Sequence, residues 1–207
     1  MKKKLYIIPA LLATLTLASC GGDDKPKATP FNNLAKCIYS SEEALTGFDE
    51  LYQIYDGDNL VHSYERNFTL ERGSQIKTSV TETTNKLSVN GNGLEETIVN
   101  YNTIDEVKYN SNGSTEDYTI PTYFLTFMVS EEYFEEGYSL VVKGSDYTLS
   151  GTVKSNYVSS VFINKSLEGV EGLTIEIIVD DSKLQSFKAT FDFESGFEGV
   201  TNIEYSY

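Results

Sequence analysis

The sequence predicts an α+β domain in which a curved antiparallel sheet, shaped as an open half-barrel, is covered by two or three amphipathic helices. Apolar and polar residues alternate in most segments after residue 60, whereas two other segments carry apolar residues at helical spacing. Short runs rich in Gly, Asn, Asp and Ser separate these segments. Strands with one apolar face are typical of a half-solvated antiparallel sheet, and helices are its natural cover.

The first helix is expected from about Ser41 to Tyr55. Ser40 is followed three positions later by Glu43, which is a capping-box pattern. Apolar residues then recur at helical spacing up to Tyr55. The run Asp-Gly-Asp-Asn at 56–59 is expected to end this helix in a turn.

Strands are expected from residue 60 onward. One strand face carries Leu60, His62, Tyr64, Phe68 and Leu70. A second strand is expected around 76–80, and weaker signals lie at 98–101 and 107–109. Further alternation is found at 138–142, 147–153, 173–179, 187–193 and 203–207. The last three of these segments are the clearest strands of the chain.

Two further helices are expected in the middle of the chain. Pro121 fits the first turn of the second helix, in which Phe124, Phe127 and Phe134 recur at helical spacing before Gly137. A short helix is expected around 156–162. All of these helices would pack on the apolar face of the sheet.

The N-terminal segment has the layout of a secretory signal. Three lysines at positions 2–4 precede an apolar stretch that is too short to span a bilayer comfortably. The run Leu17-Ala18-Ser19-Cys20 resembles a bacterial lipobox. That resemblance implies cleavage before Cys20 and attachment of lipid, including palmitate-type acyl chains, to its sulfur. Gly21 lacks the aspartate that retains such proteins at an inner membrane, so an outer-membrane location is expected if the cell has one.

These features divide the chain into three parts. Residues 1–19 are the expected signal peptide, and residues 20–38 comprise the lipidated cysteine and a flexible tether rich in Gly, Pro and charge. Residues 39–207 are expected to form a single α+β domain. Cys37 would then have no partner within the chain, and it is either a small half-buried apolar residue or an intermolecular disulfide partner.

The order of these elements resembles the LolA/LolB-like superfamily of lipoprotein carriers and related lipid-binding lipoproteins. The segments that carry the resemblance are 41–70, with its helix and long strand, and 172–207, with its three closing strands. The resemblance covers architecture alone, since no family-specific motif is present. It implies an open half-barrel whose apolar inner face holds acyl chains.

Signals for catalysis are poor. His62 is the only histidine and lies on the apolar face of its expected strand, which favours a structural role. No G-x-S-x-G elbow, P-loop or dinucleotide fingerprint occurs, and a zinc site of His and Cys ligands lacks the residues it needs. We therefore expect no enzyme activity, no catalytic residue, no cofactor and no metal. Glycoside hydrolysis by a carboxylate pair is the least favoured alternative.

Charge and aromatic content direct the functional hypotheses. The net charge of −15 argues against nucleic acid as a partner, and lipid at Cys20 would be the link to the membrane. The 15 Tyr and 11 Phe either form an ordinary packed core or line a cavity for an acyl chain. The candidate cavity residues are Tyr64, Phe68, Leu149, Ile175, Phe187 and Phe191. The alternative is a cell-surface interaction module with a solid core and an acidic exterior.

Overall fold

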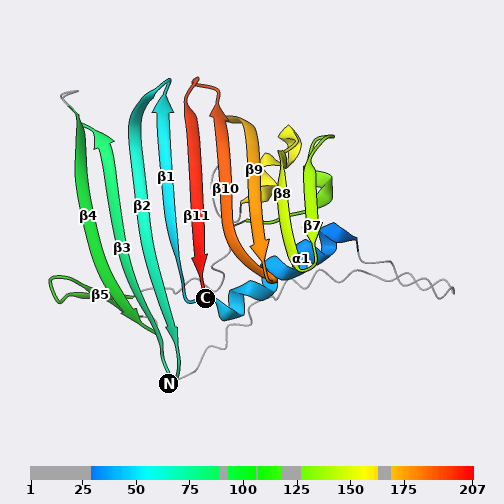
Figure 1. Ribbon diagram of the computed structural model, residues 1–207. Helices are drawn as coiled ribbons and strands as arrows, with labels where there is room; N and C mark the ends of the chain where they lie inside the picture. The colour runs from blue at the N-terminus through cyan, green and yellow to red at the C-terminus, as the bar shows by residue number, and fades with distance from the viewer. Residues whose placement is uncertain (1–28, 89–92, 106, 118–126, 163–168) are drawn as a thin grey trace, which may run out of the picture.

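One open antiparallel sheet dominates the structure. The computed structural model describes residues 29–88, 93–105, 107–117, 127–162 and 169–207. Within these residues the sheet has 11 strands in the order β6-β5-β4-β3-β2-β1-β11-β10-β9-β8-β7, so β6 and β7 are its two edges (Figure 1). The long strands curve along their length (Figure 1). The antiparallel sheet predicted from residue alternation is therefore confirmed.

The strands follow one another along the chain, and most of them pair with their sequence neighbours. They are β1 (Gly47–Asp56), β2 (Asn59–Arg72), β3 (Ile76–Leu87), β4 (Leu94–Ile104), β5 (Val107–Asn110), β6 (Thr115–Asp117), β7 (Ser139–Lys143), β8 (Asp146–Thr152), β9 (Val170–Asp180), β10 (Lys183–Phe193) and β11 (Glu198–Ser206). The pairing of β1 with β11 joins the two halves of the chain into one sheet.

The N-terminal helix α1 (Pro30–Ser41) packs against β9 and β10. The Thr29 hydroxyl accepts a hydrogen bond from the Asn32 amide at 3.2 Å and caps the helix, and Pro30 occupies its first turn. At the other end, the Ser41 hydroxyl accepts from the Leu184 amide of β10 at 2.9 Å. Residues 30–38, assigned above to the tether, therefore belong to the folded domain.

The helix predicted from Ser41 to Tyr55 is wrong. A single 3-10 turn, η1 (Glu42–Ala44), follows α1, and β1 begins at Gly47. Phe48 and Tyr52 are four residues apart, a spacing that also places both side chains on one face of a strand. Pairing decides the outcome, because β1 is hydrogen-bonded to β2 on one side and to β11 on the other.

The second predicted helix is also not observed where it can be checked. Its first part, residues 121–126, lies outside the described residues. In the remainder, Phe127 forms a bridge with Phe162, Phe134 forms one with Val153, and only η2 (Glu131–Tyr133) is helical. Outside this single turn, the backbone of the segment is hydrogen-bonded to residues 152–161, as in the bond from the Met128 amide to the Val161 carbonyl at 2.6 Å. The short helix expected around 156–162 is confirmed as η3 (Ser155–Tyr157) followed by α2 (Val158–Val161).

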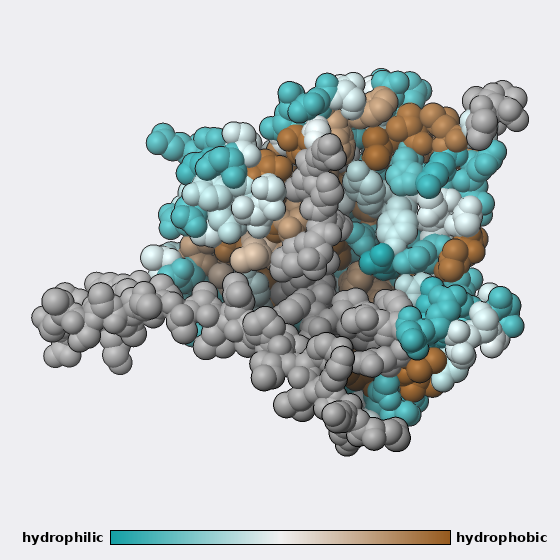
Figure 2. All heavy atoms as spheres, turned by 180° about the vertical axis from the view of Figure 1, so that it is seen from behind, coloured by the Kyte–Doolittle hydropathy of each residue, from teal (hydrophilic) through white to brown (hydrophobic). Residues whose placement is uncertain are grey.

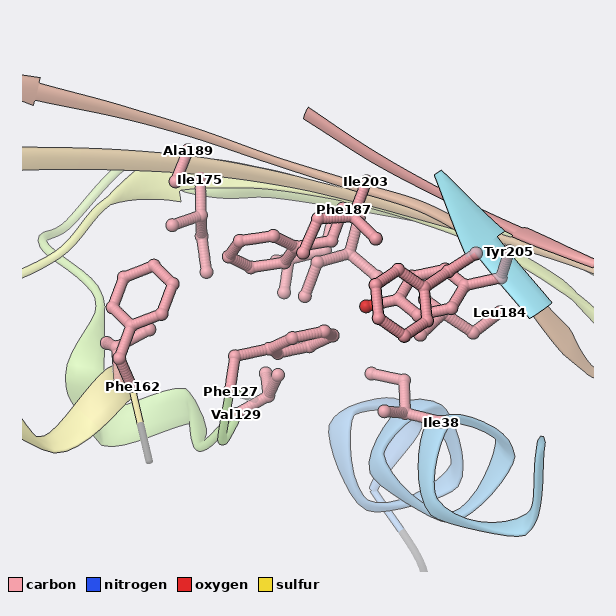
Figure 3. Close-up of a cluster of buried hydrophobic side chains, with 14 of the residues drawn as sticks. Ile38, Phe127, Val129, Phe162, Ile175, Leu184, Phe187, Ala189, Ile203 and Tyr205 are labelled. Atoms are coloured by element: carbon pink, nitrogen blue, oxygen red, sulfur yellow. The ribbon is translucent and has the colours of Figure 1, made fainter. Parts of the chain in front are cut away.

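A layer of side chains lies between the sheet and its cover. We call the sheet side that faces α1 the inner face. Phe187 of β10 stacks on Phe127 with ring centroids 4.1 Å apart, and Phe162 meets Phe187 edge-on at 5.6 Å. Ile38 of α1 reaches the same cluster (Figure 3). This half of the inner face, over β8 to β11, is a packed core.

The described helices are few and short. The longest, α1, has 12 residues, and none of the helices in the described parts of the chain is long and apolar enough to cross a membrane. The prediction of two or three covering helices is thus confirmed only in part. The described α-helices are α1, which lies before the predicted positions, and the four-residue α2.

Replacing Phe187 by alanine is expected to lower the free energy of unfolding by about 3–5 kcal/mol, because a fully buried ring leaves a cavity. Phe197→Ala is the matched control, since this ring is 38% exposed, and it should change stability by less than about 0.5 kcal/mol. Urea denaturation of both variants measures the difference. Equal losses would show that the ring cluster is not the principal core.

Candidate functional site

A charged row crosses the inner face of the sheet beside the packed core. Glu50 of β1, Arg66 of β2 and Glu82 of β3 are direct cross-strand partners, so the pleat places all three side chains on one face. Phe48 and Phe68 occupy the next inner positions and stack at 4.9 Å, which confirms that this is the core side. We call Glu50, Arg66 and Glu82 the charged row.

The guanidinium of Arg66 joins the two carboxylates. Its Nη1 lies 3.6 Å from Glu50 Oε2, and its Nε lies 3.2 Å from Glu82 Oε1. The Glu82 carboxylate also accepts hydrogen bonds from the hydroxyls of Tyr64 at 3.0 Å and Tyr101 at 3.3 Å. The side chain of Glu50 is only 8% exposed, whereas that of Arg66 is 35% exposed. One cation shared by two carboxylates suits a structural ion-pair network better than a pair of acid and base catalysts.

Burial shifts the proton equilibria of the tyrosines around the charged row. Desolvation, reinforced by the Glu82 carboxylate and opposed by Arg66, raises the pKa of Tyr64 to about 12. Burial and the nearby Glu50 carboxylate raise the pKa of Tyr205 far above its ordinary value. Within the described residues, the buried Tyr205 hydroxyl has no hydrogen-bond partner. Tyr64 and Tyr205 are therefore neutral at physiological pH.

Beyond the charged row, toward the β1–β2 turn, the inner face is lined by half-buried side chains. Tyr52 contacts His62 with ring centroids 6.2 Å apart and Phe191 at 6.3 Å, both in edge-on geometry. Ile54 and Thr84 lie beside them on the same face and are also half-buried. We call the surface formed by Tyr52, Ile54, His62, Tyr64 and Thr84 the open inner face. It is contiguous with the packed core through Phe191.

The surroundings of His62 on this face lower the pKa of its imidazole. Partial desolvation and the neighbouring Lys86 ammonium lower the pKa of His62, so its imidazole is neutral at pH 7. Lys86 is its direct cross-strand partner and lies at the exposed rim of the same face. The open inner face therefore has an aromatic floor and a cationic group at its rim.

The candidate cavity residues all lie on the inner face, but in different surroundings. Leu149, Ile175, Phe187 and Phe191 are buried in the packed core, at most 4% exposed. Phe68 is buried against Phe48. Tyr64 alone belongs to the open inner face. Their role in ligand binding stays a prediction. Cys20 lies outside the described residues.

Sequence reasoning missed the charged row. Arg66 stands at an apolar-face position of its strand, two residues after Tyr64 and two before Phe68, and that placement was the available signal. Glu50 was hidden by the mistaken helix. In the described part of the chain, no group of three or more His, Cys, Asp or Glu side chains could hold a metal ion. Cys37 is a free, half-buried thiol on α1.

Comparison with known proteins gives likenesses among solved structures alone. No family model matches the chain, and no curated protein matches it. Among solved structures, the chain is similar to the crystal structure of LprF from Mycobacterium bovis, with a TM-score of 0.40 and 12% sequence identity over 84% of this chain and 91% of that chain.

Alkaline pH should reveal the role of Tyr64. Its pKa of about 12 in the folded protein exceeds the ordinary value of 10.0. Tyr64 contributes its full stabilisation below pH 10, where it is neutral in both the folded and the unfolded chain. This stabilisation is lost as the pH rises from 10 toward 12, because Tyr64 ionises first in the unfolded chain. Tyr64→Phe loses the hydrogen bond to Glu82, so its free energy of unfolding should be lower than that of the wild type at about pH 8. The difference in free energy of unfolding should become smaller by about pH 11.

The measurement is urea denaturation at both pH values. Tyr109→Phe, which removes the hydroxyl of a 40% exposed tyrosine in β5, is the matched control for the loss of a tyrosine. If the difference in stability between Tyr64→Phe and the wild type is the same at both pH values, the pKa of Tyr64 is not raised in the folded protein.

Proposed function

We propose that the protein is an extracytoplasmic lipoprotein, anchored by lipid on Cys20, that binds an amphiphile such as a fatty acid or lipid without enzymatic chemistry. The observation that carries this proposal is the open inner face. Aromatic and aliphatic side chains form a half-buried strip there that continues the packed core, and no described helix packs on it. Such a strip offers apolar contact to a chain, and Lys86 at its rim suits an anionic head group.

The magnitude of this binding follows from the geometry. Each fully buried methylene contributes about 0.8 kcal/mol, so a chain of about twelve methylenes that is half-covered gains on the order of 5 kcal/mol. Contacts of the head group add to this gain, whereas ordering of the chain opposes it. If these two contributions balance, the dissociation constant is expected at about 0.2 mM.

A second function is favoured by a different observation. The rings of Phe127, Phe162 and Phe187 fill the space over β10, so this half of the inner face offers a solid core. A solid core with a net charge of −15 suits a cell-surface interaction module that binds a cationic partner. Saturable binding of an amphiphile separates the two functions, because the interaction module requires none.

A matched pair of variants tests the amphiphile site. Thr84 faces the open inner face, and its neighbour Thr83 faces the opposite side of the sheet. Thr84→Asp should weaken binding of a fluorescent fatty acid at least about tenfold, because a carboxylate must be desolvated beneath the chain. Thr83→Asp adds the same charge and should leave binding unchanged.

The measurement is a fluorescence titration of residues 29–207. Equal weakening by both substitutions would indicate a general charge effect. The absence of saturable binding to the unmodified domain would refute the amphiphile proposal and leave the interaction module.

The anchor is tested separately. Cys20→Ser should leave the precursor without lipid and move the protein from the membrane fraction to soluble or precursor fractions, since stable anchoring needs the acyl chains. Detergent-phase partitioning followed by immunoblotting measures this shift. A Cys20→Ser protein that still partitions with detergent like the wild type would contradict lipidation at this residue.

A further inference from the structure

Part of β4 has a neighbouring strand on one side only, although β4 is not the last strand of the sheet. β4 pairs with β3 along its whole length, but β5 pairs only with residues 101–104. Residues 94–100 are thus paired on one side alone among the described residues, and every one of them is exposed. In Figure 1 no strand is drawn beside this upper part of β4 on the side away from β3. We call residues 94–100 the free edge.

The backbone groups that the free edge presents follow from the ladder. The Ser88 amide donates to the Gly93 carbonyl at 2.9 Å, and at the other end the Asp105 amide donates to the Ile76 carbonyl at 2.7 Å. In an antiparallel pair the residues alternate between those that bond to the partner strand and those that point away. The amides and carbonyls of Leu94, Glu96 and Ile98 therefore point outward, available to another strand.

The side chains of the free edge are unusually apolar for an exposed strand. Leu94 is 41% exposed and Ile98 is 54% exposed, and Leu87 beside Leu94 is 52% exposed. All three lie on the outer face, opposite to Glu82 and Thr84. Figure 2 shows the molecule from behind, with apolar and polar side chains interspersed over its visible face. Proteins commonly shorten or charge such edges to avoid unwanted pairing. The terminal edges follow this rule, since β6 has 3 residues and β7 has 5.

We propose that the free edge binds an extended segment of a partner protein, which adds to the sheet as an antiparallel strand beside β4. Outward amides and carbonyls supply main-chain hydrogen bonds, and the side chains select the segment. Apolar residues would face Leu94 and Ile98, and basic residues would face Glu95 and Glu96. This interaction goes beyond the proposed binding of an amphiphile and does not depend on it.

Charge favours such a partner over a second copy of this chain. Two copies, each with a net charge of −15, repel one another. A basic extended segment avoids the repulsion and gains from the acidic edge.

A short peptide tests the proposal with the full chain in detergent. The probe is a fluorescein-labelled peptide of about nine residues, capped at both ends, with the central sequence Val-Thr-Lys-Lys-Val that matches positions 98 to 94 in antiparallel order. Fluorescence anisotropy should give saturable binding with a dissociation constant on the order of 100 µM. The same peptide with both lysines replaced by glutamates should bind at least about fivefold more weakly.

A backbone substitution identifies the edge itself. Ile98→Pro removes an outward amide, and it spares the ladder to β3 because that amide does not face β3. It should weaken peptide binding at least about fivefold, whereas the matched Ile98→Val, which keeps the amide, should not. Circular dichroism checks that both variants retain the sheet. Glu96→Lys should reverse the preference between the basic and acidic peptides.

Three results would overturn the proposal. One is the absence of saturable binding of the basic peptide, and another is equal binding by folded Ile98→Pro and wild type. The third is a dimer in sedimentation experiments that Ile98→Pro abolishes while the peptide does not bind, which would assign the free edge to a second copy. None of these results bears on the open inner face, so the amphiphile proposal is tested independently.

Discussion

The alignment of Glu50, Arg66 and Glu82 across three strands is the constraint on which the arrangement of the sheet depends. Glu50 is almost fully desolvated, and the Arg66 guanidinium beside it stabilises its carboxylate. A slip of one residue between β1 and β2 would separate this pair and turn Phe48 and Phe68 toward opposite faces. The same register that pairs the charges therefore also buries the rings.

This constraint divides the inner face into two surfaces with different properties. On one side, α1, α2 and the segment around Phe127 complete a packed aromatic core over β8 to β11. On the other side, Tyr52 and His62 remain half-exposed, although they lie on the same face and touch the core through Phe191. An apolar ligand gains most on an apolar surface that no described helix covers, so the proposed ligand lies there and not within the core.

The sheet was predictable from the sequence, but the helices were predicted less well. Alternation identified β2, β9, β10 and β11 most clearly, because each of these strands has one buried and one more exposed face, whereas the short β6 was not predicted. It failed at β1, where Phe48 and Tyr52 satisfy the periods of both a helix and a strand, and only pairing with β2 and β11 decides between them. It also missed α1, whose Thr29 cap and Pro30 were read as part of a linker. Local patterns cannot resolve β1, since its deciding hydrogen bonds come from distant strands, whereas the Thr29 cap and Pro30 of α1 are local signals.

The candidate site was predictable in part. The alternation placed Tyr64, Phe187 and Phe191 on the inner face, where the structure has them. It could not show that Phe127 covers Phe187, because that stack joins segments 60 residues apart in a region expected to be helical. The charged row was equally hidden, since its meaning depends on the register of three strands and not on any one of them.

The single histidine offers the most direct test of the central claim that the open inner face binds an amphiphile. The aromatic C–H resonances of His62 can be followed by NMR during titration of residues 29–207 with dodecanoic acid below its micelle concentration. If the open inner face binds the fatty acid, the His62 resonances should shift saturably. The ligand concentration at half-maximal shift should equal the midpoint of the fluorescence titration. Saturable fatty-acid binding that leaves the His62 resonances unmoved would contradict this claim, because the ligand would then lie elsewhere.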